Sequence, residues 1–269
     1  MTTTSQFNAR RYWNKRLKRD WSLHGVGMVQ LAHSYNRWMY RVRRQVFQRT
    51  VRTSRIDVAR SDVLDIGSGT GFYIDLWQKL GARQVNGVDI ADSAVAKLTK
   101  AFPGVRFERG DISEELPFEP ASFDAISAFD VLIHVVDDDK YHQALHNIHD
   151  LLKPGGTFVF SEPFPHDRRV GNGKHHLCRR LDEVQDALVE AGFEIVSRRP
   201  MFSIMASPVD TAKKWRRDLW YKRLVPILNK PFWGGAAGGL MFPFELLLTR
   251  VKRESVSMEL MVCRKPADS

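Results

Sequence analysis

An apolar segment that runs directly into a glycine-rich turn constrains the fold of this chain more than any other feature. Residues 63–73 have the sequence VLDIGSGTGFY. Glycine is needed where the backbone turns tightly or where a ligand approaches the chain closely. A buried strand followed by such a turn and then by a helix is typical of an open α/β sheet, which binds its ligands at the carboxyl ends of the strands.

The segments after this turn alternate between short apolar runs and stretches with helical periodicity. Strands are predicted at residues 84–88, 105–107, 123–128, 156–161 and 193–196, and helices at 72–80, 93–101, 141–152 and 182–191. Such alternation predicts a doubly wound α/β sheet with helices on both faces. A last strand is predicted at 256–263, after an insertion much longer than the usual loop of about 4–6 residues.

Four regions of the chain differ in composition and in predicted secondary structure. Residues 1–58 are rich in arginine and aromatic residues and are predicted to form a helical cap, in which apolar side chains recur every three or four positions and arginines fill the other face. Residues 59–200 form the predicted core. Residues 201–254 form a predicted helical insertion or lid, and residues 255–269 supply the last strand of the core and a tail.

The composition excludes several classes of protein. The chain has only two cysteines, Cys178 and Cys263, so neither a disulfide framework nor a zinc cluster is expected, and no metal site is predicted. The polar amino terminus contains no signal-peptide pattern. The apolar stretch 231–249 contains four glycines, two prolines and Glu245, and it is too short for a transmembrane helix. A cytoplasmic location is therefore expected.

The net charge of +10 is concentrated in the first 60 residues. A basic excess can indicate nucleic acid, anionic lipid or an acidic substrate as a partner. It is more commonly the solvated face of helices. A second basic segment, residues 213–223, interleaves Lys and Arg with tryptophans and could rest on a membrane surface as a peripheral contact.

The glycine turn departs from the dinucleotide fingerprint because Phe72 stands at the third glycine position, and it lacks the lysine of a phosphate loop.

Carboxylates lie at or near the ends of the first three predicted strands. Asp65, beside the turn, would repel a pyrophosphate and suits a cationic ligand. Asp89 lies 18 residues after Gly71 (89 − 71), close to the spacing at which a carboxylate holds ribose hydroxyls. Asp111, after the third strand, could accept a hydrogen bond from an adenine amino group.

These motifs together resemble those of the class I S-adenosylmethionine-dependent methyltransferases. The matching segments are DIGSGTG at 65–71, VD at 88–89, GD at 110–111 and LLKPGG at 151–156. The resemblance covers about residues 60–200 and the final strand, and it implies a seven-stranded Rossmann-like sheet whose last strand is antiparallel. It also implies S-adenosyl-L-methionine as cofactor and the following cofactor-binding residues: Asp65, Gly67, Ser68, Gly69, Gly71, Asp89, Ile90, Asp111, Ile112 and Phe129.

The family resemblance gives each part of this set a role. Asp65 and the glycine turn would hold the methionine part of the cofactor, and Asp89 would hold the ribose. Asp111 and Ile112 would flank the adenine. Phe129 would lie along the cofactor near the substrate.

A general base could assist methyl transfer, and histidines are the candidates. His134 follows the fourth strand, beside the cofactor cleft, where many members of the family also carry a histidine. It could alternatively only brace a helix. His175 and His176 lie in a loop rich in glycine and lysine and are candidate substrate contacts or plain surface residues. Tyr35 and Trp38, in the cap, are further candidate substrate contacts.

The acceptor is expected to be a small, partly apolar molecule, methylated at a hydroxyl oxygen by direct displacement. The chain has AFDV at 128–131, where relatives that methylate bases in nucleic acid often carry Asn/Asp-Pro-Pro-Tyr/Phe, so nucleic acid is disfavoured. Two alternatives stay open: an RNA methyltransferase that uses the basic amino-terminal half, and a member of the fold that binds cofactor without catalysis. The fold alone does not decide among them.

Overall fold

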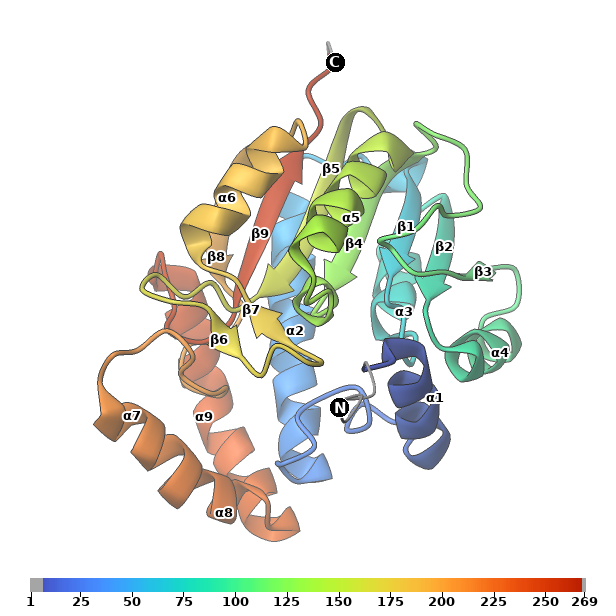
Figure 1. Cartoon of the computed structure of the whole chain (residues 1–269). Helices are drawn as coiled ribbons and strands as arrows, with labels where there is room; N and C mark the ends of the chain where they lie inside the picture. Colours follow the sequence, from blue (N-terminus) through green and yellow to red (C-terminus); the bar gives the residue numbers. More distant parts are fainter. Residues whose placement is uncertain (1–6, 268–269) are drawn as a thin grey trace, which may run out of the picture.

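A computed structural model describes residues 7–267 of the chain, and its centre is one mixed sheet of seven strands (Figure 1). The strand order is β3-β2-β1-β4-β5-β9-β8. Strands β1 to β5 pair in parallel, whereas β9 pairs antiparallel with both β5 and β8. The predicted doubly wound sheet with an antiparallel last strand is confirmed. The strands are β1 (Asp62–Ile66), β2 (Gln84–Asp89), β3 (Arg106–Arg109), β4 (Phe123–Phe129), β5 (Leu152–Glu162), β8 (Glu194–Pro200) and β9 (Glu259–Arg264).

Helices cover both faces of this sheet. The helices are α1 (Ala9–Arg19), α2 (His33–Thr53), α3 (Phe72–Lys79), α4 (Asp92–Ala101), α5 (Asp138–Leu151), α6 (Leu181–Glu190), α7 (Lys214–Asp218), α8 (Val225–Leu228) and α9 (Pro231–Val251). Short 3₁₀ turns at Val58–Arg60 and Leu132–His134 and a π-helical stretch at Leu219–Leu224 complete the helical elements of the described residues.

Alternation along the strands divides the core into two halves. In β1, Leu64 and Ile66 face the cluster that contains α5 and α6, whereas Val63 faces the cluster that contains α2 and α3. Phe47 of α2 packs edge-on against Trp77 of α3, and both side chains are fully buried. Helix α2 of the predicted cap is therefore part of the core, because it covers one face of the sheet together with α3.

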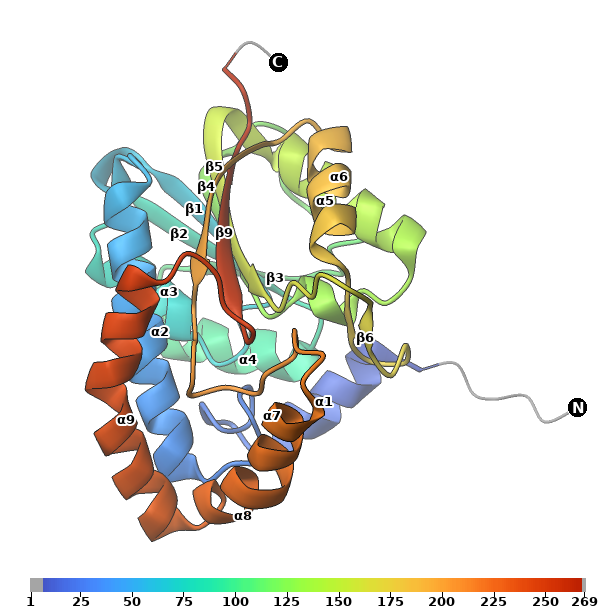
Figure 2. The same ribbon diagram turned by 90° about the vertical axis from the view of Figure 1, so that its left-hand side faces the viewer.

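The insertion between β8 and β9 forms a helical arm on the outside of α2 (Figure 2). Helix α9 packs along α2 through glycine, and a Cβ on Gly238 would lie 2.5 Å from the ring of Trp38. Glu245 of α9 is fully buried and accepts hydrogen bonds from the backbone N–H groups of Ser203 and Ile204. Within residues 7–267, no helix combines the length and the apolar character that crossing a bilayer requires.

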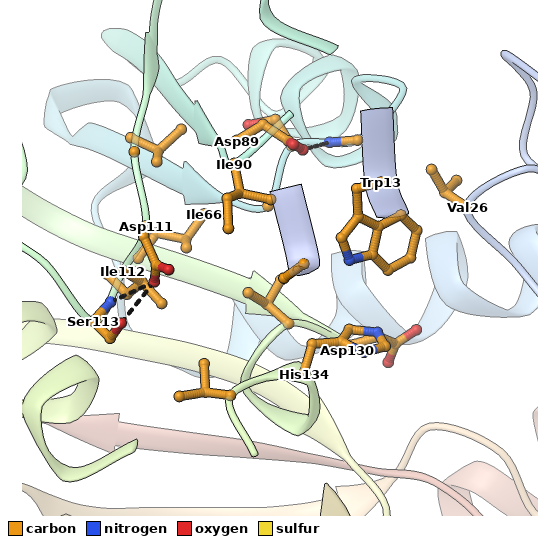
Figure 3. Close-up of a pocket in the computed structure, with 18 of the residues that line it drawn as sticks. Trp13, Val26, Ile66, Asp89, Ile90, Asp111, Ile112, Ser113, Asp130 and His134 are labelled. Atoms are coloured by element: carbon orange, nitrogen blue, oxygen red, sulfur yellow. Dashed lines mark hydrogen bonds between the residues drawn. The ribbon is translucent and has the colours of Figure 1, made fainter. Parts of the chain in front are cut away.

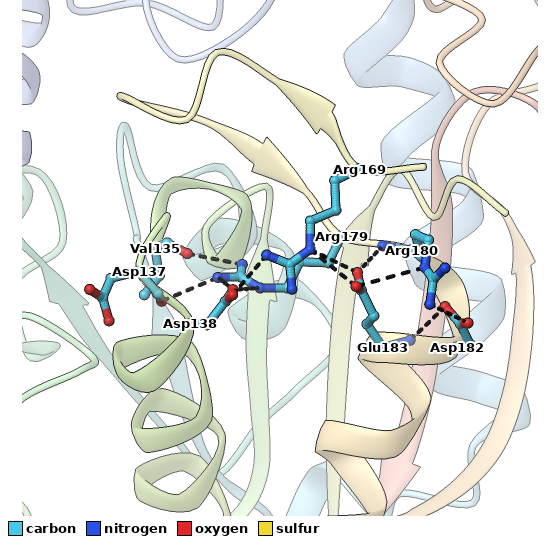
Figure 4. Close-up of polar contacts among 8 residues, drawn as sticks. All are labelled: Val135, Asp137, Asp138, Arg169, Arg179, Arg180, Asp182 and Glu183. Carbon is cyan, nitrogen blue, oxygen red and sulfur yellow. Dashed lines mark hydrogen bonds and ion pairs between the residues drawn. The ribbon is translucent and has the colours of Figure 1, made fainter. Parts of the chain in front are cut away.

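A hairpin of two short strands, β6 (Val170–Gly171) and β7 (Leu177–Cys178), is held against the core by arginines (Figure 4). Buried Arg179 donates to the carboxylate of Asp138 at 2.9 Å and to the carbonyl oxygen of Val135 at 3.0 Å. Arg169 bridges Asp138 and Glu183. These contacts join the hairpin to α5 and α6, so its tip has a fixed position beside the carboxyl end of β4.

Candidate functional site

A cavity of about 730 Å³ opens at the carboxyl ends of β1, β2 and β4 (Figure 3). One side is formed by the glycine turn and by carboxylates that follow the strands. Trp13 and Leu17 of α1, Val26, and Tyr40 of α2 complete the lining, and Val26 lies against the glycine turn, 3.1 Å from where a Cβ on Gly69 would stand. The cavity therefore has a polar wall supplied by the sheet and an apolar, aromatic wall supplied by the amino-terminal segment.

The glycine turn has a backbone conformation that other residues would strain. Gly67, Gly69 and Gly71 have φ angles of 68°, 54° and 84°, in the left-handed region. A Cβ on Gly67 would lie 2.3 Å from a methyl group of Val131. Gly67, Ser68 and Gly69 line the cavity, whereas Gly71 lies just before α3 and packs closely against Phe102.

Asp89 orients its carboxylate at the end of β2 through the backbone. Its Oδ2 accepts from the N–H of Gly69 and its Oδ1 from the N–H of Ala91, both at 2.8 Å. Burial raises the pKa of Asp89 to about 6, although the two backbone hydrogen bonds act in the opposite direction. Asp89 and Ile90 both line the cavity, and each carboxylate oxygen keeps a second lone pair for a ligand hydroxyl.

The loop after β3 brings a second carboxylate to the same cavity. Asp111 Oδ1 accepts from the N–H of Ser113 at 3.0 Å and from its hydroxyl at 2.8 Å. Asp111, Ile112 and Ser113 all line the cavity. The structure thus gathers the predicted residues from the ends of three strands into one wall.

Two predicted cofactor residues, Asp65 and Phe129, lie behind the cavity lining. Asp65 is buried, and its carboxylate accepts from the hydroxyl of Ser127 at 2.6 Å. Burial raises the pKa of Asp65 to about 7, and the nearby charge of Asp89 contributes to the increase. Phe129 stacks on Tyr73 with ring centroids 3.8 Å apart. These two side chains support the wall from behind in this structure.

His134 lines the cavity in the short turn after β4. Its Nδ1 lies 2.5 Å from the carbonyl oxygen of His175. Because a carbonyl can only accept, Nδ1 must carry the proton and Nε2 is the free acceptor of the neutral ring. Burial lowers the pKa of His134 to about 4, so the ring is neutral at physiological pH. Trp13 packs edge-on against it, with centroids 5.1 Å apart.

The other predicted substrate contacts lie outside the lining of this cavity. His175 and His176 lie in the tip of the β6–β7 hairpin, where Gly173 and Lys174 reach the cavity instead. Tyr35 is fully buried and donates its hydroxyl to the carbonyl oxygen of Met205. Trp38 packs against Phe242 of α9. Tyr35 and Trp38 thus pack between α2 and the insertion, because they lie on the side of α2 that α9 and the segment around Met205 cover.

The insertion does not close the cavity as a lid. None of residues 201–254, all of which the structure describes, belongs to its lining. The covering role belongs to the amino-terminal segment, which α4 holds in place. Arg10 Nη2 donates to Asp92 at 2.8 Å, and the N–H of Ser93 donates to Asn14 at 2.9 Å. The insertion was expected to form a lid over the cleft, whereas in this structure α1 lines the cavity and the insertion does not.

Arg43 and Asp130 form a partly buried ion pair at the cavity that was not predicted from the sequence. Asp130 has a left-handed φ of 59° and lines the cavity. Its Oδ2 accepts from Arg43 at 2.5 Å, and its Oδ1 from the hydroxyl of Ser161 at 2.8 Å. The prediction that the arginines of α2 all face solvent is wrong for Arg43. A signal existed, because Arg43 lies four residues from both Met39 and Phe47 on the buried face.

Comparison with known proteins agrees with this geometry. Residues 63–156 match the family model described as a methyltransferase domain. A protein of Mycolicibacterium smegmatis named a probable S-adenosylmethionine-dependent methyltransferase is 33% identical over 143 residues, which cover 51% of this chain and 53% of that protein. A ubiquinone biosynthesis O-methyltransferase of Albidiferax ferrireducens is 33% identical over 109 residues, which cover 39% of this chain and 42% of that enzyme.

Solved structures share the fold over a longer stretch. An S-adenosylmethionine-dependent methyltransferase from Mesorhizobium loti superposes with a TM-score of 0.51 at 20% identity, over 80% of this chain and 96% of that chain. The chain spans about half the length of the curated relatives it matches. The part that the family model matches, residues 63–156, contains the glycine turn and the carboxylates of β2 and the β3 loop, and it leaves out α1, α2 and the insertion.

Proposed function

We propose that this chain, which contains a class I S-adenosylmethionine-dependent methyltransferase domain, transfers a methyl group to a hydroxyl oxygen of a small, partly apolar acceptor. The match to the methyltransferase-domain model and the relative named a probable S-adenosylmethionine-dependent methyltransferase support the cofactor class. The acceptor class is inferred from the cavity. The observation that carries the proposal is the division of one cavity into a polar wall and an aromatic wall.

The polar wall fits S-adenosylmethionine. A side chain on Gly67 would collide with Val131, and the turn brings its backbone to the cavity surface. Asp89 would hold the ribose hydroxyls, and Asp111 would accept from the adenine amino group. When bound, the cofactor supplies a methyl group on a sulfonium, and this group transfers by direct displacement. The protein's task is then alignment, exclusion of water and proton removal.

The aromatic wall supports an apolar acceptor. Trp13, Tyr40 and Phe72 come from three different helices and all line the cavity, and the rings of Tyr40 and Phe72 pack edge-on with centroids 4.8 Å apart. An apolar pocket with a few polar groups is the usual design for small ligands. The name of the Albidiferax relative, a ubiquinone biosynthesis O-methyltransferase, supports oxygen as the accepting atom.

His134 would remove the proton from the accepting hydroxyl. Its Nδ1–H is occupied by the carbonyl of His175, so Nε2 is the unprotonated nitrogen. A pKa of about 4 keeps this nitrogen free at neutral pH and makes it a weak base. Base catalysis contributes about 10²–10⁴-fold and is most efficient when the pKa of the base lies near the operating pH, so the weak base His134 is expected to contribute at the lower end of this range. His134 thus suits a phenolic hydroxyl, which is more acidic than an aliphatic one.

The proposal is tested with purified protein, methyl-labelled S-adenosylmethionine, and a panel of catechols and demethylated quinones. We expect labelled product from at least one phenol. We also expect His134→Asn to lower kcat by about 100-fold, with little change in the affinity for S-adenosylhomocysteine. His142→Asn, at a 42% exposed side chain of α5 that does not line the cavity, is the control. Binding of S-adenosylhomocysteine without product from any phenol would favour the non-catalytic alternative, and turnover on RNA alone would overturn the acceptor class.

A further inference from the structure

Helix α9 is apolar on its outer side as well as on the side that packs on the core. The packed side carries Gly234, Gly238, Glu245 and Thr249, all of them buried, and the partly buried Met241, Phe242 and Leu246. The outer side carries Trp233, Leu240, Phe244, Leu247 and Val251, which are 58–71% exposed. A surface helix of a globular protein normally has an apolar stripe only toward the core and a polar face toward solvent.

The exposed apolar residues of α9 form one continuous stripe. Their spacings of seven, four, three and four residues keep them on one side of the helix. Phe232, which is 75% exposed, extends the stripe at its amino-terminal end. Figures 1 and 2 place α9 at the outside of the molecule, beyond α2. We call Phe232, Trp233, Leu240, Phe244, Leu247 and Val251 the α9 stripe.

Basic residues lie at both ends of the α9 stripe. The part of the insertion that precedes α9, residues 213–230, contains seven Lys or Arg and one acid, Asp218. Arg250, Lys252 and Arg253 lie at the other end. Trp215 and Leu219, within residues 213–230, are also exposed. Between the two basic ends, the α9 stripe itself contains no charged residue.

We propose that the insertion docks the protein on an anionic lipid bilayer, with the α9 stripe in the interface and the flanking cations on the headgroups. Exposed Trp, Phe and Leu bordered by Lys and Arg are what an interfacial helix requires. Anionic headgroups attract each nearby cation, and this attraction falls off within a Debye length. Because no helix in residues 7–267 can cross a bilayer, the contact is peripheral. The net charge of +10 favours this partner over a second copy of the same cationic chain.

The test is co-sedimentation of the full chain with vesicles. We expect the protein to pellet with phosphatidylcholine vesicles that contain phosphatidylglycerol, to do so less with phosphatidylcholine alone, and to be released as salt increases. Leu240→Ser/Phe244→Ser should reduce the partition coefficient by about tenfold or more. Lys213→Glu/Arg223→Glu should reduce it on anionic vesicles and flatten the salt dependence.

Matched controls distinguish binding through this surface from non-specific binding of the protein to vesicles. Val189→Ser/Val196→Ser removes two exposed valines elsewhere, and Arg60→Glu/Lys100→Glu makes the same charge change at other exposed positions; neither should alter partitioning. If the serine variant does not fold, a polarity-sensitive dye on Leu240→Cys replaces it, since both native cysteines are buried. We expect its emission to shift to the blue on anionic vesicles.

Two results would overturn the proposal. One is the absence of sedimentation on anionic vesicles together with an unshifted dye. The other is a wild-type dimer in sedimentation equilibrium that Leu240→Ser/Phe244→Ser converts to a monomer, with no vesicle binding by either protein, because a second copy would then cover the stripe. The methyl-transfer assay uses detergent-free soluble acceptors, so its outcome is independent of both.

Discussion

The carboxylate of Asp89 receives two backbone hydrogen bonds before any ligand reaches it. The N–H groups of Gly69 and Ala91 fix its orientation and tie the glycine turn to the end of β2. One side chain therefore shapes the turn and presents its remaining lone pairs to the cavity. Asp65 has a related arrangement behind the cavity lining, where the hydroxyl of Ser127 donates to its carboxylate and accepts from the indole N–H of Trp77.

Asp89→Ala is expected to weaken the binding of S-adenosylhomocysteine by about 10- to 100-fold, because hydrogen bonds to a charged group are worth about 1.5–3 kcal/mol each. Calorimetric titration measures the affinity, and thermal unfolding verifies that the variant is folded. Asp150→Ala, at an exposed carboxylate, is the control. Unchanged affinity in a folded Asp89→Ala variant would show that Asp89 does not contact the ligand.

At the scale of the element, the insertion depends on one buried acid for its attachment. Glu245 of α9 lies against the segment that follows β8 and accepts from the N–H groups of Ser203 and Ile204. Burial raises the pKa of Glu245, whereas these backbone bonds act to lower it. The acid is the only charged residue between Lys230 and Arg250, and it points away from the exposed stripe.

Glu245→Ala is expected to lower the free energy of unfolding by about 2–4 kcal/mol, because it leaves two buried N–H groups without an acceptor. Urea denaturation at neutral pH measures this change. Glu190→Ala, at a 63% exposed side chain, should change stability by less than about 0.5 kcal/mol. Equal losses in both variants would mean that Glu245 does not anchor α9.

The sequence predicted the elements of the core well and their surroundings less well. The turn at 67–71 and the acids after β2 and β3 are local features, so their place at the strand ends follows from the α/β pattern alone. The aromatic wall was not predicted, because Trp13 reaches the cavity only through contacts between α1 and α4 that are 80 residues apart. The insertion was expected over the cleft, yet its glycines fit the surface of α2 and place it outside.

At the scale of the whole molecule, buried ionisable groups control how stability depends on pH. Burial raises the pKa of Asp65 to about 7 and that of Glu162 to about 8, above their ordinary values of 3.8 and 4.5. The folded state therefore holds these protons more tightly than the unfolded state does. The free energy of unfolding falls as pH rises from the ordinary pKa values to the raised ones. His134 acts oppositely, but only below its ordinary pKa of 6.5.

Between pH 6.5 and pH 8 the carboxyls dominate, so we expect the ligand-free protein to lose about 2 kcal/mol of stability over this interval. Thermal or urea unfolding at the two pH values measures the loss. Asp65→Asn keeps an acceptor for Ser127 and removes one titrating group, so its loss should be smaller and its stability at pH 8 higher than that of the wild type. A variant with the same pH dependence as the wild type would contradict the assignment.

The position of β9 has a consequence for how the chain is made. Strand β9 lies between β5 and β8, and β8 pairs with no other strand of the seven-stranded sheet. During synthesis, the edge of β5 and the whole of β8 therefore remain unpaired until residues 259–264 have emerged from the ribosome. An unpaired edge is a template for aggregation. The nascent chain should consequently depend on chaperones, and a ribosome that stalls within the insertion should release a species that associates through these two edges.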